Sequence, residues 1–420
     1  MTLMGIVKNI WLVNKYAMPP QYESRLRTIK FAHYLQEMGY IVTVFGSSVM
    51  HNMDLDLIDD GAKYVERRYG DLNFIHIKSC HYKKTAGFSR VWSDIQFHYR
   101  LVKLAKNFNK PDLVVATTFP LFANPLLSYC HKYGIKYVTE MLDWWPDDFV
   151  DFGLVGAKNP VMKYLFWRAK KNYIDSDASV FSPPGCYKYF ADKGWDKGHG
   201  GPVDLSRVFY INNGVDLNDF NSWKQQYVIA DEDFKLDKKR IIYLGSVRLA
   251  NNVSQLIKAA ELLNESKDID FLIYGNGDDR EPLIRYCKEH DLENVKFKDK
   301  WIDPKYVPFV LSQGYINILN YTANFGKYGI SSSKMFQYMA AGKPIVCNVS
   351  IMFSPIEEHR IGVSRDMKDA KDYANVIKQF VNMPKVEYDA MCERARDAAK
   401  EYDYPYLAKK MVEVIKKIED

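Results

Sequence analysis

The hydrophobic positions of this chain fall into short apolar runs that alternate with amphipathic helical patterns. The run Ile10–Val13 is followed by a helical pattern from about Arg25 to Met38 and then by the run Ile41–Phe45. Such alternation is typical of parallel sheets with right-handed crossovers. The other expected strands are Leu113–Ala116, Lys136–Thr139, Ser179–Phe181, Val208–Ile211, Ile241–Leu244, Phe271–Tyr274, Val295–Phe297, Tyr315–Leu319 and Ile345–Cys347, with helices near Val253–Leu263 and Glu281–Glu289.

These runs are too many for one doubly wound sheet, and 420 residues are too many for one ordinary core. The rhythm breaks between about Pro202 and Lys239. We therefore predict an α/β chain of two doubly wound Rossmann-like domains that face each other across a cleft. The predicted domains are residues 1–205 and 206–395, and residues 396–420 form a C-terminal helical segment that packs back on the first domain. In such sheets, ligands bind at the C-terminal ends of the strands.

Composition excludes several classes of protein. Apolar residues make up 47% of the chain and aromatic residues 15%, which indicates a packed globular protein. No run approaches the roughly 18 apolar residues that span a bilayer, and the first residues do not have the form of a secretory signal. The six cysteines are far apart and form no C-x-x-C pair, so we expect no zinc site and no disulfide framework, and a reducing cytoplasmic location.

The net charge of +6 lies entirely in the N-terminal half, because residues 206–420 hold equal numbers of basic and acidic side chains. Within that half, the segment 78–106 is rich in lysine and arginine, and Phe88, Trp92, Phe97 and Tyr99 interleave with them. A basic aromatic surface of this kind suits an anionic membrane. The alternative is a solvated helix face whose aromatic rings lie in the core. No recognition motif for nucleic acid accompanies the charge.

The segment from Gly326 to Val346 carries the strongest candidate chemistry. Ser331, Ser332, Ser333 and Lys334 open an amphipathic helix there. A helix N-terminus presents unpaired N–H groups and a partial positive charge, so hydroxyls and an ammonium at that point suit a phosphate or pyrophosphate. The alternative interpretation is an ordinary helix with a serine N-cap.

Other polar loops follow expected strands. Gly245, Ser246 and Arg248 follow the strand that ends at Leu244, and arginine can bind an anion bidentately. The turn Gly275-Asn276-Gly277 follows the next strand, and Trp301-Ile302 offers an apolar wall. Each feature also has a structural alternative. These are an ordinary βα turn for the first loop, a tight turn for the second and a core position for the tryptophan.

In the first half, Arg25 and Arg27 lie where the first strand leads into the first helix. A group of carboxylates follows the strand that ends at Thr139, namely Glu140, Asp143, Asp147 and Asp148. Packing alone does not readily explain so many acids at a strand end. They suit a hydroxyl nucleophile or the hydroxyls of a sugar.

This set of motifs resembles a GT-B glycosyltransferase, in particular glycosyltransferase family 4 and its bacterial capsule and O-antigen branch. The resemblance covers nearly the whole chain. Its elements are Pro19-Pro20, Asp143-x-Trp145-Pro146, Asn213-Gly-Val-Asp216, the Gly-Ser loop at 245–246, Tyr274-Gly-Asn-Gly277 and Lys334-x-Phe-x-Tyr-x-Ala-x-Gly-x-Pro344.

The resemblance implies retaining transfer of a hexose or amino sugar from a nucleotide-sugar to a lipid-linked or oligosaccharide acceptor, with no cofactor and no metal. The diphosphate would face Gly245, Ser246, Arg248, Ser332, Ser333 and Lys334. The base would lie by Gly275, Asn276 and Ile302, and Gln337 would bond the ribose. Catalytic roles would fall to Asp143, Arg248 and Lys334, and the acceptor side would hold Glu23, Arg25, Glu140 and Asp143. Peripheral contact with an anionic membrane would accompany a lipid-linked acceptor.

The chain departs from the family pattern at Gly329 and Gln337, where the family has two glutamates eight positions apart. Two alternatives therefore stay open. One is a non-catalytic relative that binds a nucleotide or a partner, and the other is a nucleotide-sugar epimerase.

Overall fold

The computed structural model describes residues 7–22, 26–50, 55–81, 88–117, 120–151, 153, 155–322 and 326–419. It divides into an N-terminal unit, Met1–Asn212 with Tyr404–Asp420, and a C-terminal unit, Asn213–Asp403. The predicted limits were 205 and 395. The first limit moves to 212 because β8, Val208–Tyr210, is the last strand of the N-terminal sheet. The second moves to 403 because α14, Lys385–Ala399, packs on α11, Ser333–Ala340, of the C-terminal unit.

The described part of the N-terminal unit contains an eight-stranded sheet in the order β3-β4-β2-β1-β5-β6-β7-β8. Neighbouring strands are parallel except β3, which pairs antiparallel with β4 in a hairpin that the sequence analysis did not predict. The strands are β1 (Asn9–Val13), β2 (Ile41–Ser47), β3 (Tyr64–Tyr69), β4 (Leu72–Ile77), β5 (Leu113–Thr117), β6 (Lys136–Met141), β7 (Ala178–Phe181) and β8 (Val208–Tyr210).

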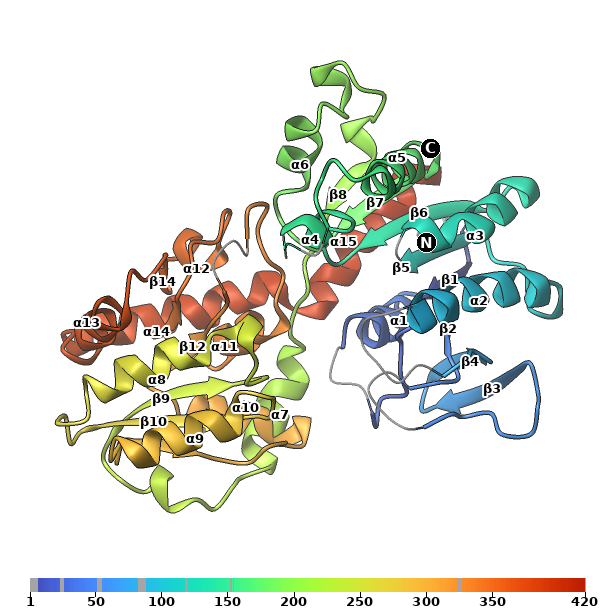
Figure 1. The fold of residues 1–420 in the computed structure, drawn as a ribbon. Coiled ribbons are helices and arrows are strands. Elements are labelled where there is room, and N and C mark those ends of the chain that lie inside the picture. Colours follow the sequence, from blue (N-terminus) through green and yellow to red (C-terminus); the bar gives the residue numbers. More distant parts are fainter. Residues whose placement is uncertain are drawn as a thin grey trace. The chain divides into compact units, whose positions relative to one another are not determined.

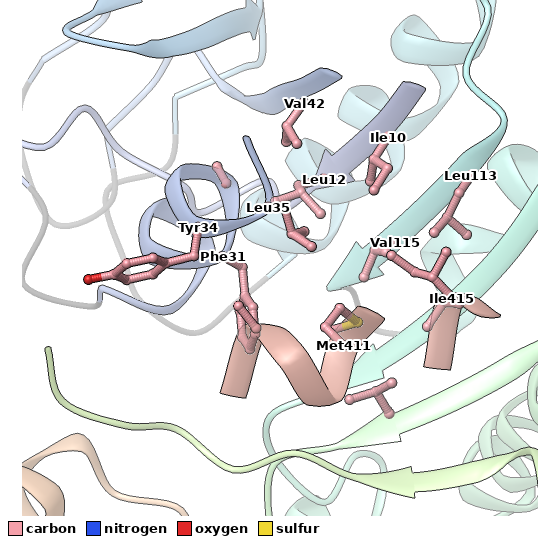
Figure 2. Packing of buried hydrophobic residues seen from close by; sticks show 14 of the residues in the cluster. Ile10, Leu12, Phe31, Tyr34, Leu35, Val42, Leu113, Val115, Met411 and Ile415 are labelled. Carbon is pink, nitrogen blue, oxygen red and sulfur yellow. The ribbon is translucent and has the colours of Figure 1, made fainter. Parts of the chain in front are cut away.

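Side chains alternate between the two faces of this sheet, so each face has its own core. On one face, Ile10 and Leu12 of β1 pack with the first and last helices of the chain (Figure 2). On the other face, Trp11 and Val13 pack with α2 and α3. The helices of this unit are α1 (Arg27–Glu37), α2 (Phe88–Leu104), α3 (Pro120–Tyr133), α4 (Asp147–Asp151), α5 (Pro160–Asp175), α6 (Cys186–Asp192) and α15 (Tyr404–Glu419) (Figure 1).

The C-terminal helix belongs to the N-terminal unit. Met411 and Ile415 of α15 lie beside Phe31 of α1 and the strand residues Leu113 and Val115, as Figure 2 shows. The helix is amphipathic, so its apolar stripe covers part of the sheet while its lysines stay outside. In the described ranges, every helix is too short or too polar to cross a bilayer.

The described part of the C-terminal unit contains a six-stranded, all-parallel sheet in the order β11-β10-β9-β12-β13-β14. The strands are β9 (Lys239–Leu244), β10 (Ile269–Tyr274), β11 (Val295–Phe297), β12 (Ile316–Leu319), β13 (Ile345–Cys347) and β14 (Gly362–Ser364). The helices are α7 (Leu217–Gln226), α8 (Val253–Glu261), α9 (Arg280–Glu289), α10 (Val307–Ser312), α11 (Ser333–Ala340), α12 (Pro355–Glu358), α13 (Ala370–Val381) and α14 (Lys385–Ala399).

The strand order of this second sheet determines where a ligand can bind. Counted along the chain it reads 3-2-1-4-5-6, so the direction of winding reverses between β9 and β12. In such sheets the ligand crevice opens outside the carboxyl ends of the strands at that reversal. The two loops that flank the reversal follow β9 and β12, and they hold Gly245 and the serine-lysine segment. Both domains are thus Rossmann-like, as the sequence predicts.

Candidate functional site

The candidate donor site is the carboxyl edge of the C-terminal sheet, where the loops after β9, β10 and β12 meet. These loops contact one another through backbone atoms. The amide of Gly245 donates to the carbonyl of Tyr274 at 3.0 Å, and the amide of Val247 donates to the carbonyl of Asn276 at 2.9 Å. The edge is therefore a fixed backbone platform rather than a set of independent loops.

Two glycines allow this close contact between the loops. Gly275 has φ of 120°, and a β-carbon there would lie 1.8 Å from the carbonyl oxygen of Gly245. Gly277 has φ of 157°, and a β-carbon there would lie 2.2 Å from the carbonyl oxygen of Val247. The family resemblance places Gly275 beside the nucleotide base. In the structure, the approach of the neighbouring loop already requires both glycines.

Lys334 lies at the centre of the candidate donor site. A β-carbon on Gly245 would lie 2.0 Å from Nζ of Lys334, so the absence of a side chain at 245 leaves the space for the ammonium. The same nitrogen lies 5.5 Å from the ring centroid of Tyr243. The phenol of Tyr243 in turn donates to the carbonyl of Ser246 at 2.6 Å. Gly245, Tyr243 and Lys334 thus form one contact group at the end of β9.

The ammonium of Lys334 lacks a compensating charge among the described residues. Burial lowers the pKa of Lys334 to about 8, and no carboxylate acts against that effect. A half-buried cation without a counter-ion favours an anionic ligand, because the ligand restores the interaction that burial removes. Of the predicted site residues, Lys334 has the environment that most favours an anion.

Arg248 lies three positions after Gly245 in the loop that follows β9. Its side chain is exposed, and its stem rests on Gly277, where a β-carbon would come within 2.7 Å of Cγ. No ion pair involves Arg248 among the described residues. The guanidinium is therefore available to a ligand at the same edge of the sheet as Lys334.

The predicted serine cap takes a different form in the structure. Helix α11 begins at Ser333 with Ser332 at the N-cap, yet the side chain of Ser332 makes no capping hydrogen bond. The side chain of Ser332 instead hydrogen-bonds with Tyr321. The hydroxyl of Ser331 accepts a hydrogen bond from the backbone amide of Asn213 at 2.8 Å. The first N–H groups of α11 are consequently not capped by the serine, which leaves the helix N-terminus open to an anion.

The remaining donor-side residues lie on α11 and in the loop after β11. Gln337 is half-buried on α11, one turn after Lys334. Ile302 lies in the loop after β11 and packs against the core of the C-terminal unit. Trp301 is 73% exposed, so its core alternative is wrong. Gly329 has φ of 80°, a conformation that a glutamate would adopt only under strain. The backbone at 329 therefore accounts for one departure from the family pattern.

In the N-terminal unit, Glu140 forms a buried ion pair. Nε of Arg27 donates to Oε1 of Glu140 at 2.8 Å, both side chains are about 5% exposed, and the hydroxyl of Thr117 donates to the other oxygen. Arg27 also donates to the carbonyl of Asn212 at 2.5 Å. The pair links the first helix to β6 and to the end of the unit. An acceptor role for Glu140 stays a prediction, and the structure shows that its carboxylate is already bonded on both oxygens.

The acidic segment after β6 is anchored by one of its carboxylates. Asp147 accepts from the phenol of Tyr189 at 2.8 Å and pairs with Nζ of Lys193 at 2.6 Å. Asp143 is exposed at the turn before α4. The sequence analysis missed Lys193 and Tyr189, because they lie more than forty positions away and no local pattern marks them.

Asp148 has the most perturbed carboxyl of this segment. Burial, and then the charges of Asp143, Asp151 and Asp147, raise its pKa to about 7. A carboxyl with this pKa exchanges its proton near neutral pH, as a general acid or base does. The other predicted acceptor-side residues, Glu23 and Arg25, lie outside the described residues, so their roles stay predictions.

The basic aromatic segment divides between core and surface. Phe97 is fully buried, whereas Trp92 and Tyr99 are 51% and 53% exposed on α2. The side chain of Phe88 and residues Lys83 and Lys84 lie outside the described part of the chain. The alternative in which the rings lie in the core therefore holds for Phe97 and is wrong for Trp92 and Tyr99.

The chain resembles known proteins in part of its sequence and in its whole fold. Residues 225–402 match the family model of glycosyl transferases group 1. No curated protein matches the chain. Three similar solved structures are α,α-trehalose 6-phosphate synthase of Burkholderia multivorans (15% identity, TM-score 0.73, 98% of this chain and 99% of that chain), the E. coli trehalose-6-phosphate structure bound with UDP-2-fluoro glucose (11%, 0.72, 98% and 99%) and HepE of Anabaena in complex with UDP-glucose (13%, 0.65, 97% and 99%).

The whole-chain likeness to these structures shows the GT-B fold, and the family match over residues 225–402 of the C-terminal unit supports a glycosyltransferase. This confirms the predicted fold. Membership of glycosyltransferase family 4 stays a prediction.

Proposed function

We propose that this protein transfers a hexose or an amino sugar, with retention of anomeric configuration, from a nucleotide-sugar to a lipid-linked or oligosaccharide acceptor. The reaction would serve the synthesis of a cell-surface polysaccharide such as a capsule or O-antigen. It would need no metal, because protein cations and a helix N-terminus would take the charge of the leaving diphosphate.

The observation that carries the proposal is the ammonium of Lys334, which lies against Gly245 with no carboxylate of the described residues to balance it. It lies where the winding of the C-terminal sheet reverses, beside the open N-terminus of α11. Lys334, Arg248 and the first amides of α11 would bind the diphosphate. Each would stabilise the charge that grows on the leaving oxygen as the glycosidic bond breaks.

The rest of the donor would extend along the same edge. Gly275, Asn276 and Ile302 would border the base, and Gln337 would bond the ribose hydroxyls with a neutral amide. Two of the similar structures hold UDP-glucose or its fluoro analogue, which supports a uridine nucleotide as the first donor to test.

The acceptor would bind the N-terminal unit at the carboxyl ends of β1, β5 and β6. Asp143 would orient the attacking hydroxyl, and the neighbouring Asp148, whose pKa is about 7, would supply or take a proton. Glu23 and Arg25 would contribute from the loop after β1. A lipid-linked acceptor requires contact with the cytoplasmic face of a membrane, which the exposed aromatic rings of α2 support.

The test is incubation of the purified protein with a UDP-sugar and a lipid-linked acceptor, with NMR of the product. An α-linked product from an α-linked donor supports the proposal. Binding of the nucleotide-sugar without any transfer would favour the non-catalytic alternative, for which Gln337 at a family glutamate position is the specific observation. Isomerisation of the donor sugar without an acceptor would favour the epimerase.

A further inference from the structure

Helix α2 presents an apolar stripe to solvent. Val91, Trp92, Ile95 and Tyr99 are exposed, and the spacing of three to four residues places them on one side of the helix. The opposite side carries Phe97 and Leu101 in the core. The stripe continues into Lys103, whose ammonium lies 4.5 Å from the ring centroid of Tyr99.

Helix α5 presents a second stripe of the same kind. Val161, Tyr164, Trp167 and Ile174 are exposed, again at intervals that share one side of the helix. The rings of Tyr164 and Trp167 lie 5.8 Å apart, and both are more than half exposed. The guanidinium of Arg168 lies 5.5 Å from the ring of Trp167, so a cation accompanies the aromatic pair here too.

Both stripes point to the same side of the N-terminal sheet. Helix α3 packs against α2 and also against α5. The sheet residues under α2 and α3 include Tyr137, and the residue under α5 is Thr139, which accepts from Asn172 of α5 at 2.7 Å. Tyr137 and Thr139 are two positions apart on β6 and therefore share a face. The exposed sides of α2, α3 and α5 thus form one outer surface, which we call the α2-α5 surface.

The other face of the same sheet lacks this pattern. Among the described residues, the large apolar side chains exposed on the α2-α5 surface are Val91, Trp92, Ile95, Tyr99, Tyr133, Val161, Tyr164, Trp167 and Ile174, whereas α1 and α15 on the opposite face expose only Tyr406. Scattered apolar exposure would affect both faces alike. The asymmetry indicates that the α2-α5 surface meets an apolar environment.

The charge on the α2-α5 surface is predominantly positive. Helices α2, α3 and α5 together carry eight lysines and arginines and two aspartates. Asp94 is buried beside Lys15, and Asp175 pairs with Lys171. Cations with long stems can extend past the aromatic rings to a layer of anionic head groups. Tryptophan and tyrosine are the residues that favour the boundary between water and lipid.

We propose that the α2-α5 surface is a membrane-docking face that binds an anionic lipid bilayer, with Trp92 and Trp167 inserted at the level of the head groups. The inference deepens the membrane contact of the proposed function and adds α5 to the segment that the sequence indicated. Two stripes on separate helices give two contacts, and paired contacts with an anionic surface bind far more firmly than either alone.

The test is co-sedimentation of the full-length protein with vesicles of phosphatidylglycerol and phosphatidylethanolamine, and with vesicles of phosphatidylcholine alone. Two variants act on the surface, one with Trp92→Ser and Trp167→Ser and one with Lys103→Glu and Lys163→Glu. The matched controls on α15 are Tyr406→Ser and Lys409→Glu, which alter one exposed ring and one exposed cation on the opposite face. Thermal shift by UDP-glucose, measured on every variant, shows that folding and donor binding persist.

We expect the wild-type protein to bind anionic vesicles. The affinity of each surface variant for these vesicles should be lower by about tenfold or more, and both controls should bind as the wild-type protein does. The tryptophan fluorescence of wild type should shift to the blue on binding. Absence of vesicle binding by wild type that still responds to UDP-glucose would overturn the inference while leaving donor binding intact. A dimer in light scattering that the tryptophan variant loses, without vesicle binding, would also overturn it and assign the surface to a second copy of the chain.

Discussion

The ammonium of Lys334 occupies the space that a β-carbon at position 245 would need, with only 2.0 Å between that carbon and Nζ. Gly245 lies in the loop after β9 and Lys334 in the first turn of α11, 89 positions apart in the chain. Because of this contact, the glycine and the lysine act together in the candidate donor site. The glycine admits the cation to the carboxyl edge of the sheet, and the half-buried position strengthens the attraction of that cation for an anion.

Gly245→Ala should therefore weaken donor binding without a large loss of stability. The methyl group meets the far end of a flexible side chain, so the lysine can move away from the edge. Lys334→Met should act more strongly, with a barrier to transfer higher by about 2–4 kcal/mol, as for loss of one charge-stabilising donor. The ratio kcat/KM for the UDP-sugar measures both effects, and Lys258→Met on α8 is the control. A wild-type value of kcat/KM in the Lys334→Met variant would contradict the role of Lys334 in the donor site.

Donor affinity should depend on pH through Lys334. Because burial lowers its pKa to about 8, the side chain is charged below that pH and loses its proton above it. Binding of UDP should be constant below about pH 7.5 and weaken about tenfold per pH unit above 8. Isothermal titration from pH 7 to pH 9.5 tests this. Lys334→Arg should flatten the profile, since a guanidinium keeps its proton over this range. An unchanged slope in that variant would assign the dependence to another group.

Stability of the N-terminal sheet should fall on the acid side through His76. Its ring lies 3.2 Å from the carbonyl of Ser47 and 3.2 Å from the phenol of Tyr69, and burial lowers its pKa to about 4. Between pH 6.5 and 4, the unfolded chain binds a proton that the folded chain does not. Stability therefore decreases by about 1.4 kcal/mol per pH unit over that window. Hydrogen exchange of the β2 and β4 amides at pH 7 and pH 5 should show this loss in wild type and a smaller one in His76→Gln.

Asp148 should affect the pH dependence of stability in the direction opposite to His76. Its pKa is raised to about 7 in the folded chain, so the folded state binds the proton first as the pH falls from 7 to 4. The ionised carboxyl is thus a stability cost above pH 7. Asp148→Asn should remove that cost and raise stability at pH 8 by about 2 kcal/mol, and the gain should disappear as the pH falls from 7 to 4. Amide exchange in β6 measures the gain, and the exposed Asp59→Asn is the control. Equal gains at pH 8 and pH 4 would contradict an ionisation effect.

The sequence predicted the second domain more accurately than the first. The bounds of β11 and β13 agree with the expected runs. For β13 the reason is that a buried parallel strand is a continuous apolar run between turn residues. The hairpin of β3 and β4 was missed because β3 is an edge strand whose sequence, YVERRY, is polar and half exposed. Edge strands carry charges that hide the strand pattern.

The sequence also predicted only part of the candidate site. Local patterns identified the loops after β9, β10 and β12, because glycine, serine and lysine at strand ends are visible in the sequence. They could not show that Gly275 packs on Gly245 or that Gly245 makes room for Lys334, since those contacts depend on strand order. The ion pair between Asp147 and Lys193 could not be predicted for the same reason, because α4 and the segment after α6 meet only in the folded chain.

The measurement that tests the central claim most directly is a thermal-shift titration of wild type and Lys334→Met with UDP, GDP, ADP and their sugar conjugates. A ligand that binds only the folded state raises its apparent stability. We expect one nucleotide and its sugar conjugate to raise the melting temperature of the wild-type protein. The Lys334→Met variant should be equally folded without ligand, and its affinity for the same ligands should be at least tenfold lower. No response of well-folded wild type to any of these ligands would contradict a nucleotide-sugar site at the carboxyl edge of the C-terminal sheet.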